Sequence, residues 1–378
     1  MLVAKKIFEL PELTTLSGKT IANVRIGWES YGTLNADRSN AILVCHFFSG
    51  TSHAAGRYQE SDPLPGYWDA IIGPGKAVDT DKYFVFSSDT LVNVNARDPM
   101  VTTTGPASID PATGKPYGLS FPLVTIGDFV SVQKALVDHL GIDKLHAVIG
   151  PSMGGLQTYE WAASYPDRME RIIPVIAAAA PSAWLIAWLN IWAAPIRLDP
   201  NWNGGEYYGR AAPLAGLAEA IKIIGLQANH FEWVDATYGA AFARADFDPR
   251  AALDNKFAVE AAFEAAGAAR AALSDANHLL YLVKANQTFV PGSGAGAKTA
   301  AEGLQRIQAP ALVLYTPTDQ VFPPSAVKAT IQALADNGLP VESGEIAGPF
   351  GHLNGLYAIA PHGERIAEFL ARPIAPAG

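Results

Sequence analysis

A serine among glycines is the first group in this sequence that could do covalent chemistry. The run GPSMG at positions 150–154 fits the pattern G-x-S-x-G, between an apolar run and a helical pattern. A turn from strand to helix this tight leaves almost no room for side chains beside the serine, and it holds the hydroxyl clear of the sheet. The N–H of Met153 would then start a helix, where developing negative charge is favoured. The pattern predicts that Ser152 is a nucleophile and Met153 an oxyanion donor; the alternative is a glycine turn with an idle serine.

A serine hydroxyl needs a base, and that base needs an acid to orient it. In enzymes with this serine turn, the acid and then the histidine follow the serine along the chain, each in a loop after a strand. Asp319 and His352 satisfy that order, and each follows a predicted strand. Asp336 and His362 also come after the serine, but both fall in helical patterns, where a solvated side chain is the ordinary expectation. We therefore expect a triad of Ser152, Asp319 and His352.

The loop after the apolar run 40–48 is the usual source of the second oxyanion amide. Phe48 is the predicted donor, and His53 in the same loop is expected either to shape the pocket or simply to pack. The histidines and acids show no metal-ligand spacing, and no glycine-rich dinucleotide fingerprint follows a strand. We expect neither a metal nor a cofactor.

Short apolar runs alternate with helical patterns over most of the chain. Such alternation predicts an α/β fold with a mostly parallel, doubly wound sheet. The predicted strands lie at 40–48, 83–88, 145–150, 171–179, 309–315 and 341–348, and clear helical patterns at 126–141, 154–166 and 324–338.

Residues 181–300 break this alternation, because successive helical patterns follow one another there without a strand. We expect a core formed by residues 1–180 and 301–378, with residues 181–300 inserted as a helical cap or lid. Three tryptophans at the start of the cap recur every four residues and so share one helical face. This stripe, at Trp184, Trp188 and Trp192, either packs against the core or lines a site.

Composition bounds the function further. The chain has 378 residues, 49% of them hydrophobic, and a net charge of −9 without any basic block, which argues against nucleic-acid binding. No uncharged run approaches the roughly 20 residues needed to cross a bilayer, and the start lacks a signal-peptide pattern. Cys45 is the single cysteine, so no intramolecular disulfide can form. We expect a cytoplasmic protein that acts on a small molecule, without membrane or nucleic-acid partners.

Several longer motifs resemble the homoserine O-acetyltransferase family, and the similarity runs over almost the whole chain. The resemblance implies an α/β-hydrolase fold and acetyl transfer from acetyl-CoA to homoserine through an acyl-serine. It also implies Ser152, Asp319 and His352 as the triad, with amides of Phe48 and Met153 as oxyanion donors, and is compatible with a homodimer. The motifs are PGYWDAIIGPGKAVDTDKYFVF, TGPASIDPATGKPYG, GPSMGGLQTYEWAASYPDRMERIIPV and DPNWNGGEYY.

Two positions depart from the pattern of that family. Leu353 follows the histidine where the family commonly has an aspartate for the amino group of homoserine, and Ala193 stands where we align the cap arginine for its carboxylate. Trp192, next to Ala193, cannot replace that arginine. Burying both charges of homoserine without partners would cost on the order of several kcal/mol. These four residues, Leu353, Ala193, Trp192 and His53, are the predicted substrate pocket.

The missing charges favour a serine esterase that cleaves short acetate-type esters of small alcohols and clears its acyl-serine with water. In this respect the chain resembles the homoserine-acetyltransferase-like esterases. The alternative is an acyl-CoA-dependent O-acetyltransferase for homoserine or another alcohol, which requires Arg197 or a residue of loop 89–106 to reach the acceptor carboxylate. A catalytically dead binding module is a third hypothesis, but no member of the triad is missing.

Overall fold

An eight-stranded sheet forms the centre of the computed structural model, which describes residues 1–373; residues 374–378 of the predicted core lie outside the described part. The sheet order is β1-β2-β6-β3-β9-β10-β11-β12. All neighbouring pairs from β6 to β12 are parallel, whereas β1 pairs antiparallel with β2, and β2 with β6. The strands are β1 (Lys6–Thr14), β2 (Thr20–Tyr31), β3 (Ala41–Val44), β6 (Phe84–Ser88), β9 (Ala147–Pro151), β10 (Ile172–Val175), β11 (Ala311–Tyr315) and β12 (Val341–Glu345).

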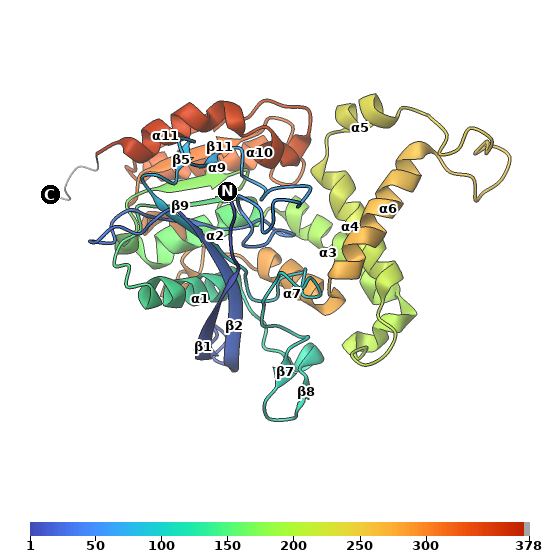
Figure 1. The fold of residues 1–378 in the computed structure, drawn as a ribbon, viewed down its shortest axis with the longest axis horizontal. Helices are drawn as coiled ribbons and strands as arrows, with labels where there is room; N and C mark the ends of the chain where they lie inside the picture. Colours follow the sequence, from blue (N-terminus) through green and yellow to red (C-terminus); the bar gives the residue numbers. More distant parts are fainter. Residues whose placement is uncertain (374–378) are drawn as a thin grey trace.

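The sheet is covered on both faces, so the predicted mostly parallel, doubly wound α/β architecture is confirmed. Alternate residues of β3 enter different hydrophobic clusters: Leu43 packs with helices on one face and Ile42 with those on the other. Figure 1 shows α1 and α11 on opposite sides of the strands. One face carries α1 (Ile126–His139), α2 (Met153–Ser164), α8 (Ala300–Gln305) and α9 (Pro324–Asp336), and the other α10 (Asn354–Tyr357) and α11 (Gly363–Ala371).

The predicted helices begin and end within two residues of the sequence patterns, but the predicted strands are all shorter than expected, two of them by five residues. The run 40–48 forms a strand only over Ala41–Val44, and the run 171–179 only over Ile172–Val175. Directly after β10, Ile176 has a φ of +47°, which ordinary strand geometry does not allow. Both β3 and β10 end before the apolar run does, because the chain turns there at the carboxyl edge of the sheet.

Between β10 and α8 the chain forms five successive α-helices, which we call the helical segment. Figure 1 shows α4 and α6 beside the sheet, with α5 above them. Among residues 1–373, no helix is long and apolar enough to cross a membrane. The helices are α3 (Ala183–Leu198), α4 (Leu214–Ala228), α5 (Phe231–Tyr238), α6 (Ala258–Leu273) and α7 (Ala276–Gln287). The remaining short strands pair as β4 (Ile72–Gly73) with β5 (Val78–Asp79), and β7 (Ile109–Asp110) with β8 (Lys115–Pro116).

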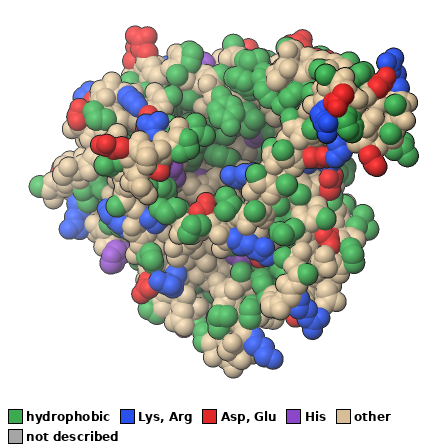
Figure 2. Space-filling model, turned by 45° about the vertical axis from the view of Figure 1, so that its right-hand side comes forward, with side chains coloured by type: hydrophobic (Ala, Val, Ile, Leu, Met, Phe, Trp, Pro, Cys, Tyr) green, Lys and Arg blue, Asp and Glu red, His purple; other side chains and the backbone are tan. Residues whose placement is uncertain are grey.

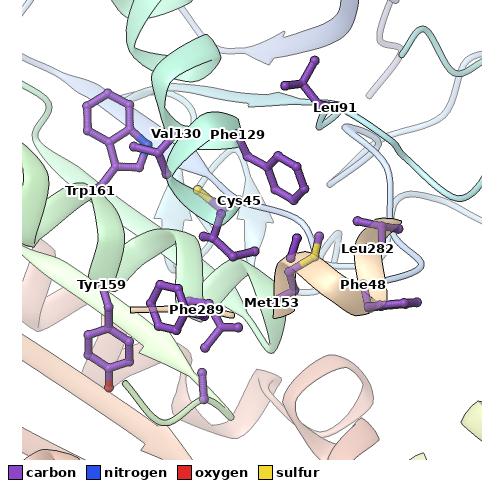
Figure 3. Close-up of a cluster of buried hydrophobic side chains, with 14 of the residues drawn as sticks. Cys45, Phe48, Leu91, Phe129, Val130, Met153, Tyr159, Trp161, Leu282 and Phe289 are labelled. Atoms are coloured by element: carbon purple, nitrogen blue, oxygen red, sulfur yellow. The ribbon is translucent and has the colours of Figure 1, made fainter. Parts of the chain in front are cut away.

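The start of α2 lies against the end of β3, and this contact fixes the turn at position 152. A Cβ on Gly154 would lie 2.1 Å from the carbonyl oxygen of Cys45, and one on Gly150 would lie 2.5 Å from the backbone of Gly154. Figure 3 shows Cys45 and Met153 within one buried cluster that also contains Val130 of α1. The glycines of the G-x-S-x-G run are therefore required by the close approach of two backbones.

We predict that Gly154→Ala lowers the free energy of unfolding by about 1–3 kcal/mol, the usual cost of overpacking, because the added methyl meets backbone that cannot move aside. Gly225→Ala in α4 is the matched control. Its Cβ would meet nothing closer than 3.7 Å, and alanine favours a helix by up to about 1 kcal/mol. Chemical denaturation of both variants tests this, and equal stability of the two would contradict the packing account.

Candidate active site

Ser152 stands at the carboxyl end of β9 and caps the N-terminus of α2. Its backbone has φ +57° and ψ −121°, a conformation that non-glycine residues rarely adopt. The amide of Ser152 donates a hydrogen bond of 2.9 Å to the carbonyl of Val175 at the end of β10, which holds the turn against the sheet. The side chain is 8% exposed. A strained, well-anchored backbone thus presents one hydroxyl at the edge of the sheet.

The structure brings Ser152, His352 and Asp319 together although 200 residues separate the first two. The Nε2 atom of His352 lies 2.8 Å from the Oγ of Ser152, and its Nδ1 lies 2.8 Å from Oδ2 of Asp319. The other carboxylate oxygen of Asp319 accepts from the amides of Val321 and Phe322. With the aspartate fixed in this way, Nδ1 carries the ring proton, and Nε2 is free to accept the proton of the hydroxyl.

Asn354, which the sequence interpretation missed, holds the loop that carries His352. Its amide nitrogen donates to the hydroxyl of Thr316 at 2.8 Å and to the carbonyl of Gly348 at 3.0 Å, and its side-chain oxygen accepts from the amide of Phe350. Asn354 is fully buried. These bonds tie the histidine loop to the end of β11, where the aspartate loop begins. An asparagine two residues after a histidine belongs to no periodic pattern, so no local feature of the sequence identifies it as part of the site.

Two backbone amides beside Ser152 remain available for a ligand. Within residues 1–373, the N–H groups of Phe48 and Met153 donate to no protein acceptor. Met153 is the first residue of α2, so the positive end of the helix dipole adds to its amide. Phe48 lies in the segment after β3 (residues 45–54), which we call the β3 loop. The two amides come from the two backbones that meet at Gly154 and are suited to a developing oxyanion.

Asparagines of the loop 89–106 donate hydrogen bonds to two carbonyls of the β3 loop. The side chain of Asn93 donates to the carbonyl of Gly50 at 3.0 Å, and that of Asn95 donates to the carbonyl of Ser49 at 3.1 Å. Asn93 and Asn95 also bind one another. With its carbonyls satisfied on one side, the β3 loop can present amides on the other.

His46 fixes the beginning of the same loop. Its Nδ1 lies 2.7 Å from the carbonyl of Phe47, and its Nε2 accepts from the amide of Thr90. Burial lowers the pKa of His46 to about 4, although its hydrogen bond to Phe47 opposes the shift. The ring is therefore neutral at pH 7, and it serves as a structural donor and acceptor.

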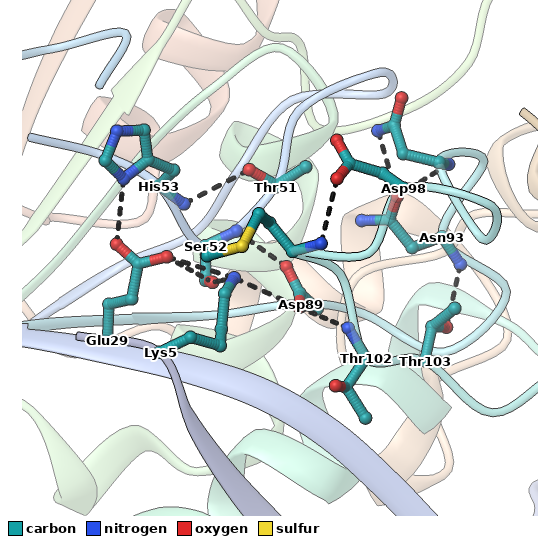
Figure 4. A network of polar contacts seen from close by, with 12 residues as sticks. Lys5, Glu29, Thr51, Ser52, His53, Asp89, Asn93, Asp98, Thr102 and Thr103 are labelled. Carbon is teal, nitrogen blue, oxygen red and sulfur yellow. Dashed lines mark hydrogen bonds and ion pairs between the residues drawn. The ribbon is translucent and has the colours of Figure 1, made fainter. Parts of the chain in front are cut away.

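A buried ionic network supports the far end of the β3 loop (Figure 4). The ammonium of Lys5 lies 3.0 Å from the carboxylate of Glu29 and 3.4 Å from that of Asp89, and it also contacts the hydroxyl of Ser52. Asp89 accepts from the amide of Ser52 at 2.8 Å. His53 lies 3.0 Å from Glu29 through Nδ1. The network thus joins β1, β2 and β6 to one end of the loop.

The two carboxylates of this network respond to burial in opposite ways. Burial acts to raise the pKa of Glu29, but hydrogen bonds from His53 and Tyr58 and the charge of Lys5 outweigh it and lower the pKa to about 2. Burial prevails at Asp89 and raises its pKa, despite the charge of Lys5. Glu29 is therefore firmly ionised at neutral pH, and its charge stabilises the fold.

The four predicted pocket residues do not form one surface. His53 belongs to the ionic network and stacks on Tyr58 at 4.2 Å. Ala193 is fully buried, and Trp192 is 4% exposed with its ring edge-on to that of Phe48. Leu353 packs against the hydrophobic cluster under α10 and α11. Within the described part of the chain, no cluster of histidine, cysteine, aspartate or glutamate could hold a metal ion.

Trp192 is the one buried member of the tryptophan stripe. Trp184 is 51% exposed, and its indole N–H donates a hydrogen bond to the carbonyl of Gln320, the residue after Asp319. Arg197 is exposed and bonds to Asn190.

Comparisons with known proteins agree with this fold. Residues 41–357 match the family model described as alpha/beta hydrolase fold. The chain is 42% identical to a homoserine O-acetyltransferase from Methanohalobium evestigatum, over 93% of this chain and 70% of the relative. It is 37% identical to one from Solidesulfovibrio magneticus, over 99% and 94% of the two chains.

Two solved structures superpose on nearly the whole chain. The crystal structure of homoserine O-acetyltransferase from Bacillus anthracis is 36% identical, with a TM-score of 0.93 and 99% coverage of both chains. The crystal structure of esterase E22 is 47% identical, with a TM-score of 0.93 and coverage of 98% of this chain and 100% of that one.

The prediction of an ester hydrolase is wrong. Relatives about 40% identical over most of the chain are named homoserine O-acetyltransferase, and they favour the transferase alternative instead. The prediction gave more weight to the missing counter-charges at Leu353 and Ala193 than to the alternative that Arg197 or a residue of loop 89–106 reaches the acceptor carboxylate.

We predict that Glu29→Gln destabilises the protein by up to about 3 kcal/mol at neutral pH, because one unit of pKa shift corresponds to about 1.4 kcal/mol. The pKa of Glu29 falls from its ordinary 4.5 to about 2, so its stabilising effect is complete above pH 4.5. That effect is lost as the pH falls toward 2. Denaturation of wild type and variant at several pH values should show the difference shrinking over that range. The exposed Glu12→Gln is the control, and a pH-independent difference for Glu29→Gln would refute the charge argument.

Proposed function

Because the chain belongs to the homoserine O-acetyltransferase family of the α/β-hydrolase fold, we propose that it transfers an acetyl group from acetyl-CoA to an alcohol through an acyl-serine. The observation that supports this most strongly is the continuous hydrogen-bonded chain from Asp319 through His352 to Ser152, beside two unpaired amides. The acyl-transferring character follows from the relatives, and the roles of the individual residues are part of the proposal.

In the first half of the proposed reaction, the Oγ of Ser152 attacks the thioester carbonyl while Nε2 of His352 takes the hydroxyl proton. A bond forms between Oγ and the acyl carbon, and the carbonyl oxygen becomes an oxyanion facing the amides of Phe48 and Met153. The bond between carbon and sulfur then breaks, and His352 returns the proton to the thiolate of CoA. Asp319 holds the ring tautomer and stabilises the imidazolium that exists between the two transfers.

In the second half, the alcohol repeats the same steps in reverse. Its oxygen attacks the acyl carbon, Nε2 of His352 takes the alcohol proton, and the new ester leaves as Ser152 regains its proton. Water could enter the same path, so transfer requires that the alcohol occupy the site better than water does. The low exposure of Ser152 and His352, 8% and 7%, favours that outcome because little solvent reaches them.

We further propose that residues 181–300 act as a cap on a core made by residues 1–180 and 301–378. The helical segment supplies side chains next to each catalytic loop: Trp192 contacts Phe48, and the indole of Trp184 bonds to the carbonyl of Gln320, beside Asp319. The cap would thereby enclose the acceptor.

The first test is release of CoA from acetyl-CoA with and without homoserine, followed with a thiol reagent. Cys45, the single cysteine, is fully buried, so the reagent reports CoA. We predict that release rises with homoserine concentration and that an acetyl ester of the acceptor accumulates in equal amount. Release at the same rate with water alone, homoserine or other short alcohols would contradict the transferase proposal.

The second test addresses the residues. Ser152→Ala should lower turnover by about 10⁶-fold, because the acyl group then has no covalent carrier. Asp319→Asn should lower it by about 10⁴-fold, because the histidine loses its tautomer and its counter-charge. Ser325→Ala is a matched control, since this serine is exposed at the start of α9. Turnover in Ser152→Ala close to that of the control would exclude the acyl-serine.

A further inference from the structure

A cavity of about 320 Å³ lies between the helical segment and the β3 loop. Figure 2 shows the face that includes the helical segment, with hydrophobic side chains around a hollow and Lys or Arg side chains next to it. The wall is largely apolar and comes from α4, α5, α6 and α7, with main contributions from Ile221, Ile224, Trp233, Phe263 and Leu279. A cavity of this size and lining suits a small organic molecule with an apolar body.

The cavity adjoins both loops of the candidate active site. Phe48, whose amide faces the proposed oxyanion position, is part of the wall, and so is Ser49. On the other side, Asn229 of the wall touches Gly351: a Cβ on Gly351 would lie 3.1 Å from the backbone of Asn229. Gly351 directly precedes His352. An alcohol whose apolar body fills the cavity therefore lies next to the β3 loop and next to the loop that carries His352.

The charges on the wall have one sign. Lys222 and Arg270 line the cavity, and neither aspartate nor glutamate does. Lys222 is paired with Glu219 at 2.6 Å, so its charge is already compensated. Arg270 forms no ion pair with residues 1–373, although Asp98 attracts it from beyond ion-pair distance. Arg270 is thus the uncompensated cation of this wall.

Arg270 is also held in place by its surroundings. Its Nη2 donates to the carbonyl of Ser49 at 2.9 Å and to the side-chain oxygen of Asn95 at 3.0 Å. Its Nη1 and Nε have no hydrogen-bond partner in the described part of the chain, and the side chain reaches solvent. A fixed guanidinium with free N–H groups is the donor that binds a carboxylate through two parallel bonds.

From this wall we propose that Arg270 binds the carboxylate of the acceptor, and that the preferred acceptor is a short hydroxy acid without an α-amino group. This inference rests on the proposed transferase function and names its acceptor class. A carboxylate gains two charge-assisted hydrogen bonds at Arg270, whereas an ammonium group finds no anionic partner on this wall, whose charged side chains are two cations and whose other polar side chains are neutral. Burying such a group without a partner is unfavourable. The hydroxyl, at the other end of the molecule, is left to react with the acyl-serine.

The test compares three acceptors that differ by one group each: homoserine, 4-hydroxybutyrate, which lacks the amino group, and 1-butanol, which lacks the carboxylate as well. CoA release from saturating acetyl-CoA gives kcat/KM for each acceptor. In the wild-type protein, we expect the kcat/KM for 4-hydroxybutyrate to exceed the values for homoserine and 1-butanol by at least tenfold. A kcat/KM for homoserine equal to or above that for 4-hydroxybutyrate would overturn the proposed acceptor class.

The variant Arg270→Gln separates carboxylate binding from support of the β3 loop. Loss of the hydrogen bond to Ser49 would slow the reaction with every acceptor alike. The informative quantity is therefore the ratio of kcat/KM for 4-hydroxybutyrate to that for 1-butanol, because a uniform effect leaves this ratio unchanged. We expect this ratio to fall at least tenfold in Arg270→Gln and to recover in part in Arg270→Lys. Arg244→Gln, at an exposed arginine paired with Asp246, should leave it unchanged.

The remaining outcomes are also decisive. A ratio that Arg270→Gln does not change overturns the role of Arg270, even where CoA release still depends on an alcohol. A phosphate of CoA could use the same guanidinium; in that case the substitution raises the KM for acetyl-CoA with every acceptor and leaves the ratio intact, which also overturns the proposal. If no alcohol increases CoA release, the proposed function itself has failed.

Discussion

The close approach of two backbones, at the end of β3 and the start of α2, is the constraint on which the candidate site depends. Only glycine can occupy position 154, because a Cβ there would overlap the carbonyl oxygen of Cys45. The same contact forces Ser152 into a rarely adopted backbone conformation at the carboxyl edge of the sheet. The proposed oxyanion amides, of Phe48 and Met153, belong to these same two backbone segments. The sheet order explains the location, since β6 lies on one side of β3 and β9 on the other, and open α/β sheets bind their ligands where the strand order switches sides in this way.

Buried polar groups then hold the loops that this contact brings together. The carboxylates of Glu29 and Asp89 fix one end of the β3 loop, while Asn93 and Asn95 bind its carbonyls in the middle. Arg270 completes this support from the helical segment through the carbonyl of Ser49. Because one residue contacts both the loop and the cavity wall, acceptor binding and the position of the oxyanion amides are physically linked. Such fixed dipoles need little reorganisation during reaction, which is the main advantage of a prearranged site.

Local patterns in the sequence were sufficient for the architecture and for the members of the triad. The alternation of apolar runs with helical patterns located β3, β9 and β11 and the helices α1, α2 and α9. The G-x-S-x-G run and the chain order of acid and base selected Ser152, Asp319 and His352, which the structure places in hydrogen-bond contact. The antiparallel pairs that β1 and β2 form were missed, because neither strand contains a continuous apolar run.

The supporting groups could not be predicted, because each acts on a segment far away in the chain. Asn95 meets the carbonyl of Ser49 across 46 residues, and Arg270 meets the same carbonyl across 221. Nothing local in the sequence indicates that an arginine at the end of α6 will face an active-site loop. That limitation also explains the wrong prediction of an ester hydrolase, which gave most weight to the charges missing at aligned positions. The position of a helix in three dimensions decides which charge an acceptor meets.

The most direct test of the account is mass spectrometry of the protein quenched shortly after mixing with acetyl-CoA. The account predicts an added acetyl group on the peptide that contains Ser152, lost faster when an alcohol acceptor is present than in buffer alone. Absence of that covalent species under rapid quenching, or an acetyl group located on another residue, would contradict the central claim that Ser152 carries the acyl group between donor and acceptor.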